Sequence, residues 1–268
     1  MAQRDQQRAE TVRRFGYQQR RARAYDLAAK CPFAAELLAF YARMAEIQSQ
    51  VSSAAGATLT AGPSDFHTLA DSVLERLLSY VPVFEDIVRS HGPAAMADAV
   101  KGGIDWPGLL RSFWTDRAAS SPEARFFALA LLQPYAELVA VGASLPAGQS
   151  GNCPVCGSEP VVGVLRPEGY GARRSLICSL CSSEWDFLRA TCPSCSETRP
   201  EALPVYTSEQ FEHVKIEACD TCKQYLKTVD LTKDGLAVPI VDELATVPLN
   251  LWAGEKNYTK LCPNLFNL

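Results

Sequence analysis

The stretch CSLCSSEWDFLRATCPSC, residues 178–195, decides the fold because it holds two C-x-x-C pairs within eighteen residues. A third pair lies before it in CPVCGSEP, residues 153–160, and a fourth lies after it in ACDTCKQY, residues 218–225. The chain has ten cysteines. Random placement of that many would give about 0.4 such pairs, so four pairs are a strong signal. These eight thiols either react or hold a ligand.

The four pairs form a repeat. The first and third pairs are both C-P-x-C, in CPVCGS and CPSCSE, and they begin 39 residues apart. The second and fourth pairs follow an apolar run and precede an aromatic residue, in LICSLCSSEW and IEACDTCKQY, and they begin 41 residues apart. Each half therefore has the pattern C-x2-C-x21–23-C-x2-C, which is close to the spacing of zinc ribbons. The repeat predicts two tandem modules with one metal site each.

Two cysteines three positions apart on a tight turn direct both sulfur atoms toward one point, and two such knuckles supply a tetrahedral site of four sulfur atoms. The repeat favours sequential pairing of the knuckles over a cross-brace that would join the first pair to the third. The predicted ligands are Cys153, Cys156, Cys178 and Cys181 for the first site, and Cys192, Cys195, Cys219 and Cys222 for the second. Iron and zinc both suit this ligand set, so the residues leave the metal open. His213 could approach the second site, but a surface strand histidine is the favoured interpretation.

Other uses of paired cysteines have less support. Disulfides need an oxidising compartment, and no export signal is recognisable in the sequence. A dithiol redox C-x-x-C follows a strand and opens a helix, whereas the second and fourth pairs here lie between strand-like runs. No nucleotide-binding fingerprint, nucleophile motif or catalytic acid pair stands out in the rest of the chain.

The cysteine-poor half of the chain is predicted to be helical. Apolar residues recur at helical spacing over residues 26–51 and 66–88, and Pro32 marks a helix end or start. Residues 126–141, FFALALLQPYAELVAV, are almost wholly apolar and predict a central buried helix. No apolar run approaches the about 18 residues that span a bilayer, so we expect no membrane insertion.

From residue 153 the pattern changes to short β-prone runs between cysteine turns, at 161–165, 174–178, 185–190, 213–219 and 224–231. The predicted fold class is α+β, an all-helical N-terminal domain followed by two tandem rubredoxin-like or zinc-ribbon modules. The predicted boundaries are 1–148 for the helical domain, 149–190 and 191–232 for the two modules, and 233–268 for a C-terminal tail that packs back on the domains.

Charge separates the two halves of the chain. Residues 1–149 carry 15 basic and 15 acidic side chains, whereas residues 150–268 carry 11 basic and 15 acidic ones. Binding of a phosphate backbone needs a basic face, so a nucleic-acid-binding zinc ribbon is the least favoured hypothesis. The first 23 residues include seven arginines, but no apolar segment or cleavage site of an export signal follows them. The sequence therefore predicts a cytoplasmic protein.

The flanks of the cysteine pairs point to a family. The chain has C-P-x-C-G-S-x-P at 153–160, C-S-L-C-x-x-E-W at 178–185, C-P-x-C at 192–195 and C-x-x-C at 219–222. With the tail PIVDELATVPLNLWA, residues 239–253, this series resembles the FdhE family of formate dehydrogenase accessory proteins. The resemblance covers the whole chain, and its specific part is residues 153–253.

The resemblance implies a function. FdhE-like proteins are cytoplasmic and are needed for active respiratory formate dehydrogenases, which carry molybdenum cofactor and selenocysteine and are exported folded. They bind the catalytic subunit before export, and their rubredoxin-like modules carry iron. For this chain the resemblance implies two iron ions, one per four-cysteine site, with zinc as the alternative. Such sites have no open coordination position, which implies a maturation factor that is not an enzyme. A redox protein that controls the redox state of the dehydrogenase is the other hypothesis.

Overall fold

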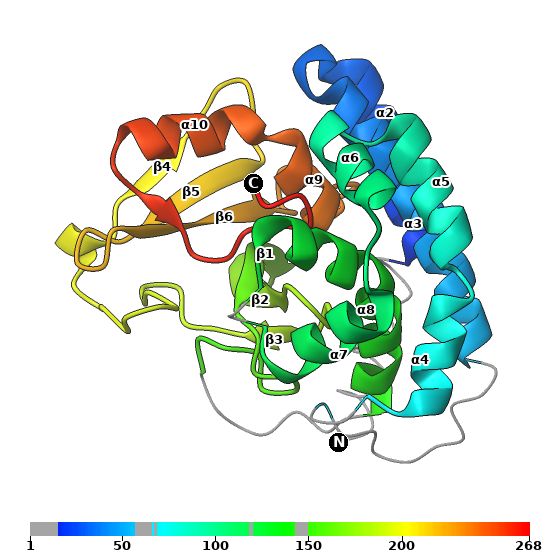
Figure 1. Cartoon of the computed structure of the whole chain (residues 1–268). Helices are drawn as coiled ribbons and strands as arrows, with labels where there is room; N and C mark the ends of the chain where they lie inside the picture. The colour runs from blue at the N-terminus through cyan, green and yellow to red at the C-terminus, as the bar shows by residue number, and fades with distance from the viewer. Residues whose placement is uncertain (1–15, 57–65, 67–68, 118–119, 143–149) are drawn as a thin grey trace.

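The structure is a computed structural model and describes residues 16–56, 66, 69–117, 120–142 and 150–268. Figure 1 shows helices from the N-terminal part of the chain beside a sheet built from the C-terminal part. This arrangement confirms the predicted α+β class. The domain boundaries stay a prediction, and much of the arginine-rich arm, residues 1–15, lies outside the described residues.

The described part of the N-terminal half contains seven α-helices and a 3-10 turn. These are α2 (Tyr17–Lys30), η1 (Pro32–Ala34), α3 (Ala35–Gly56), α4 (Asp71–Leu78), α5 (Val81–His91), α6 (Ala94–Gly102), α7 (Trp106–Thr115) and α8 (Pro122–Gly142). Pro32 separates two helices, as expected. The single helix expected over 66–88 is instead two, because Pro82 in the first turn of α5 cannot continue the hydrogen bonding of α4.

Helix α8 forms the centre of the helical half. Residues 126–132 are each at most 2% exposed, and the helix packs against α3 and α7. By length and composition α8 could cross a membrane, but 72% of that segment is buried inside the protein. The expected central buried helix is therefore confirmed, and its apolar side chains are covered by other helices.

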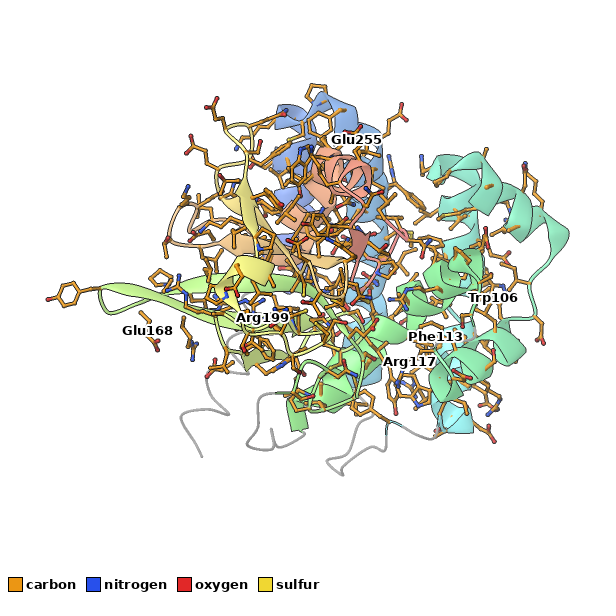
Figure 2. The ribbon with its side chains drawn as sticks, turned by 90° about the vertical axis from the view of Figure 1, so that its left-hand side faces the viewer. Trp106, Phe113, Arg117, Glu168, Arg199 and Glu255 are labelled. Atoms are coloured by element: carbon orange, nitrogen blue, oxygen red, sulfur yellow. The ribbon has the colours of Figure 1, made fainter. Side chains whose placement is uncertain are left out.

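The C-terminal half forms a twisted sheet. Its strands are β1 (Pro160–Glu168), β2 (Gly171–Cys178), β3 (Glu184–Asp186), β4 (Val205–Thr207), β5 (Val214–Ala218), β6 (Gln224–Asp230) and β7 (Thr259–Lys260). The order is β3-β2-β1-β6-β5-β4, with β7 beside β6. The hairpin of β1 and β2 projects from the molecule, with Glu168 near its tip (Figure 2). The short strands β4 and β7 were not expected from the sequence.

The two cysteine repeats share this sheet because β1 and β6 pair in parallel. Gly163 lies opposite Thr228 in this pairing. A Cβ atom on Gly163 would lie 2.3 Å from the Thr228 hydroxyl oxygen, which is far inside contact distance. Glycine is therefore needed where the two strands approach, since a side chain would push them apart.

The C-terminal segment returns to the rest of the chain. It contains α9 (Pro239–Ala245) and α10 (Val247–Glu255), and α9 lies against α2, β1 and β6 (Figure 1). Lys227 of β6 is fully buried and pairs with Glu243 of α9 at 2.8 Å. Burial of the ammonium group lowers the pKa of Lys227 to about 8. This buried pair fixes α9 on the sheet.

Candidate metal centres

The structure gathers the eight paired cysteines into two groups of four, and the groups follow the sequential pairing rather than the cross-brace. Within each group the four Sγ atoms lie within 4.8 Å of one another. In the first group the Sγ atoms of Cys156 and Cys178 are 3.3 Å apart, and those of Cys153 and Cys181 are 3.6 Å apart. We call this group the first cluster.

The second cluster has the same spacing. The Sγ atoms of Cys192 and Cys222 are 3.7 Å apart, and those of Cys195 and Cys219 are 3.6 Å apart. Four sulfur atoms around a metal ion, each at about 2.3 Å from it, lie about 3.8 Å from one another in a regular tetrahedron. Each cluster can therefore hold a metal ion, and the distances suit iron and zinc alike.

Each knuckle is closed by a residue in the left-handed region. The residue after the second cysteine has a positive φ in all four knuckles: Gly157 (75°), Ser182 (50°), Ser196 (61°) and Lys223 (57°). The backbone N–H at this position donates to the carbonyl of the first cysteine at 2.8–3.0 Å in three of the knuckles, at Gly157, Ser196 and Lys223. Small residues were expected at this position, and Lys223 departs from that expectation with its ammonium group on Asp220 at 2.6 Å.

The protein prepares the sulfur atoms for a cation. The backbone N–H of Leu180 donates to the Sγ atom of Cys178 at 3.4 Å. Burial raises the pKa of Cys178 and of Cys181, whereas hydrogen bonding with Cys153 lowers the pKa of Cys156. The thiol protons of the cluster are thus held unequally. A bound metal ion replaces them, so metal uptake releases protons.

The first cluster is enclosed by the helical half. Its cysteines are between 0% and 8% exposed. The side-chain amide of Gln133 on α8 donates to the carbonyl of Ser179 at 2.9 Å. The guanidinium of Arg117 donates to the carbonyl of Cys156 at 3.3 Å. Both knuckles of the first cluster are therefore attached to the helices.

A buried ion pair makes a third attachment. The Arg20 guanidinium on α2 lies 2.9 Å from the Glu137 carboxylate on α8, and these side chains are 4% and 7% exposed. The hydroxyl of Ser182 donates to the same carboxylate at 2.6 Å. Sequence reasoning missed this pair, although Glu137 is the one charged residue in the apolar run 126–141. A lone charge in such a run signals a buried partner, because an unpaired charge is costly there.

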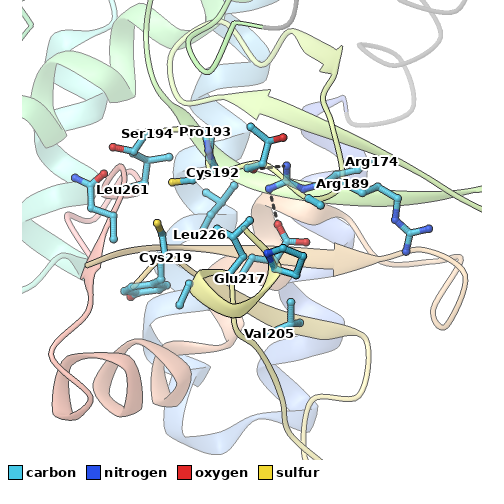
Figure 3. Close-up of a pocket in the computed structure, with 17 residues that line it drawn as sticks. Arg174, Arg189, Cys192, Pro193, Ser194, Val205, Glu217, Cys219, Leu226 and Leu261 are labelled. Carbon is cyan, nitrogen blue, oxygen red and sulfur yellow. Dashed lines mark hydrogen bonds and ion pairs between the residues drawn. The ribbon is translucent and has the colours of Figure 1, made fainter. Parts of the chain in front are cut away.

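The second cluster is open by comparison. Cys195 is exposed and Cys222 is half-buried. A pocket of about 200 Å³ lies beside the cluster, and Cys192 and Cys219 form part of its wall (Figure 3). The buried Arg174 guanidinium pairs with the Glu217 carboxylate at 2.5 Å on another side of this pocket.

His213 joins neither cluster. Its Nε2 atom lies 2.8 Å from the Asp242 carboxylate, and its side chain is 21% exposed, just before β5. The Arg23 guanidinium lies 2.6 Å from both Asp242 and Asp234. This cation already neutralises the two carboxylates, so we interpret the group as a salt-bridge network that ties α2 to α9 rather than as a metal site.

Two family models match the chain without a gap between them. "FdhE, central domain" matches residues 152–189, and "FdhE, C-terminal domain" matches residues 190–267. A protein FdhE homolog from Aquifex aeolicus is 31% identical over 200 residues, which cover 72% of this chain and 71% of that protein. The chain belongs to the FdhE family.

Other FdhE relatives match mainly over part of their length. The homolog from Edwardsiella ictaluri is 40% identical over 114 residues, which cover 42% of this chain and 37% of that protein. The homolog from Pseudomonas putida is 36% identical over 128 residues, which cover 45% and 39%. The crystal structure of the FdhE protein from Pseudomonas aeruginosa has a TM-score of 0.71 at 22% identity and covers 95% of this chain and 96% of its own. The fold is thus shared across both halves.

Proposed function

We propose that this protein is an accessory factor for the maturation of a respiratory formate dehydrogenase. It binds the catalytic subunit in the cytoplasm before export and is not itself an enzyme. The observation that carries the proposal is the 31% identity to an FdhE homolog over 72% of the chain. The FdhE family resembled by the cysteine flanks consists of formate dehydrogenase accessory proteins, which supplies the client.

We further propose that the eight cysteines bind two metal ions, one in each cluster. Iron is the proposed metal, and zinc is the alternative that the same sulfur geometry accommodates. The sulfur spacing supports the sites, and four thiolates leave no open coordination position for hydrolytic chemistry. Bound iron would supply one-electron redox chemistry. The protein's own part is to hold the four sulfur atoms at a fixed spacing and to exclude water from the first cluster.

A gene deletion tests the client. We expect the deletion strain to lose respiratory formate dehydrogenase activity, and a plasmid copy of the gene to restore it. An affinity-tagged copy should co-purify with the catalytic subunit from the cytoplasmic fraction. Formate dehydrogenase activity that is intact in the deletion strain would contradict the proposed function.

One feature favours a redox role as the second candidate. Cys195 is exposed, so an electron-transfer partner can approach the second cluster closely. Anaerobic purification with elemental analysis and an absorption spectrum separates the two roles. Red protein that bleaches on reduction keeps the redox role. Colourless, zinc-loaded protein that still matures the client removes it.

A further inference from the structure

The two clusters have the same ligands but different surroundings. The four cysteines of the first cluster belong to the same hydrophobic core as residues of the helical half such as Phe127 and Leu131 of α8. Among the described residues, the cysteines of the second cluster belong to none of the hydrophobic cores. Opening the first cluster therefore disturbs the main core, whereas opening the second is a local event.

The attachments to the helices have the same asymmetry. Gln133, Arg117 and Glu137 each bind a residue in a knuckle of the first cluster. These partners lie on α7–α8 or between them, so the knuckles cannot separate unless the helical half also moves. The first cluster is held closed by parts of the chain that carry none of its ligands.

The surroundings of the second cluster are exposed. Near its knuckles, the Thr221 hydroxyl donates to Glu197 at 2.6 Å, and Glu197 pairs with the largely exposed Arg199 at 2.8 Å. Exposed contacts of this kind contribute little stability, because water competes for both partners. Cys195 itself is exposed, so one ligand already faces solvent.

The pocket gives a second approach to the same sulfur atoms. Cys192 and Cys219 lie together at one side of it, near Leu226 and Leu261 (Figure 3). Its volume of about 200 Å³ is below the about 300–1,000 Å³ of most small-molecule sites, so it fits a group of side-chain size. A chelating group of that size can reach the second cluster from the pocket while Cys195 is approached from solvent.

We infer that the first cluster holds a locked structural metal ion, and that the second holds an exchangeable ion reached through this pocket. The inference rests on the proposal that both clusters bind metal. A metal ion that leaves without unfolding of the core can be supplied, removed or contacted by a partner in the folded protein. The second cluster is therefore the metal centre that faces other molecules.

Zinc release tests the inference in the full-length protein. Protein loaded with two zinc ions is mixed with an excess of a chromogenic chelator, and zinc transfer is followed by absorbance. We expect two phases of one zinc each, with rates that differ by about tenfold or more because only the slow phase needs opening of the core. The variant Cys195→Ser should lose the fast phase and keep the slow one. Its circular dichroism should match that of the wild type.

A pocket-filling variant tests the route. Ala190 is exposed and lines the pocket, so Ala190→Trp should fill part of the pocket and slow the fast phase by about threefold or more. Ala95 is exposed on α6, and Ala95→Trp should leave both phases unchanged. An unchanged fast phase in Ala190→Trp would overturn the pocket as the route.

The outcomes separate this inference from the proposed function. Two zinc ions that leave in one phase, or a slow phase that disappears in Cys195→Ser, would overturn the asymmetry while leaving metal binding intact. A protein that binds no zinc and no iron would overturn the proposed metal sites as well.

Discussion

The ion pair of Arg20 and Glu137 yields a prediction about how the helical half and the first cluster depend on each other. The substitution Glu137→Gln keeps the side-chain volume and removes the charge. It leaves the Arg20 guanidinium buried without a counter-ion, and it weakens the acceptor of the Ser182 hydroxyl. We expect a loss of folding stability and a looser first cluster.

The size of the loss follows from the geometry. At the observed 2.9 Å, an effective dielectric constant of about 20 gives a gross attraction of about 6 kcal/mol. Breaking a buried pair by removal of one partner costs about 3–5 kcal/mol in measured cases. The neighbouring pair of Arg21 and Glu46 is the matched control, because its side chains are 44% and 45% exposed. Glu46→Gln should cost less than about 1 kcal/mol.

Urea unfolding of the zinc-loaded variants, followed by circular dichroism, measures both losses. Glu137→Gln should lower the midpoint with an unchanged m-value, and it should accelerate the slow phase of zinc release. Equal losses in Glu137→Gln and Glu46→Gln would refute the reasoning. So would a destabilised variant whose slow zinc phase is unchanged, since the pair would then not hold the knuckle.

Three further predictions concern the clusters and the buried lysine. Cys178→Ser should prevent stable folding of the whole chain, because a structural site contributes about 10–16 kcal/mol against a total stability of about 5–15 kcal/mol, whereas Cys195→Ser should keep its helical circular dichroism; equal loss of helix in both variants would contradict this. Glu243→Gln should cost about 3–5 kcal/mol in urea unfolding because Lys227 is left buried and unpaired, and Lys227→Met should cost less because Lys260 still pairs with Glu243; the reverse order would contradict it. Although burial opposes it, attraction to Lys227 and Lys260 lowers the pKa of Glu243 to about 2, so its stabilising contribution is complete above the usual pKa of 4.5 and is lost as the pH falls from 4.5 toward 2. Acid titration of stability should show this loss in the wild type and not in Glu243→Gln.

The sequence determined the eight cysteines, their division into two groups and the order of helices and strands. Ligand spacing in a knuckle is a local property: two cysteines three apart and a residue that tolerates positive φ specify the turn, whatever surrounds it. The apolar run of α8 was equally clear, because a helix that is apolar on all sides must be buried. The break between α4 and α5 was missed, although Pro82 carried the local signal.

Only the tertiary structure decided how the two repeats differ. Parallel pairing of β1 with β6 joins segments about sixty residues apart, and Gly163 allows it only because Thr228 lies opposite. The attachments of Arg117, Gln133 and Glu137 enclose one cluster and not the other. Nearly identical cysteine motifs thus have different exposure, because solvent access depends on which distant residues pack over a site, and that packing is not encoded in the spacing of the ligands.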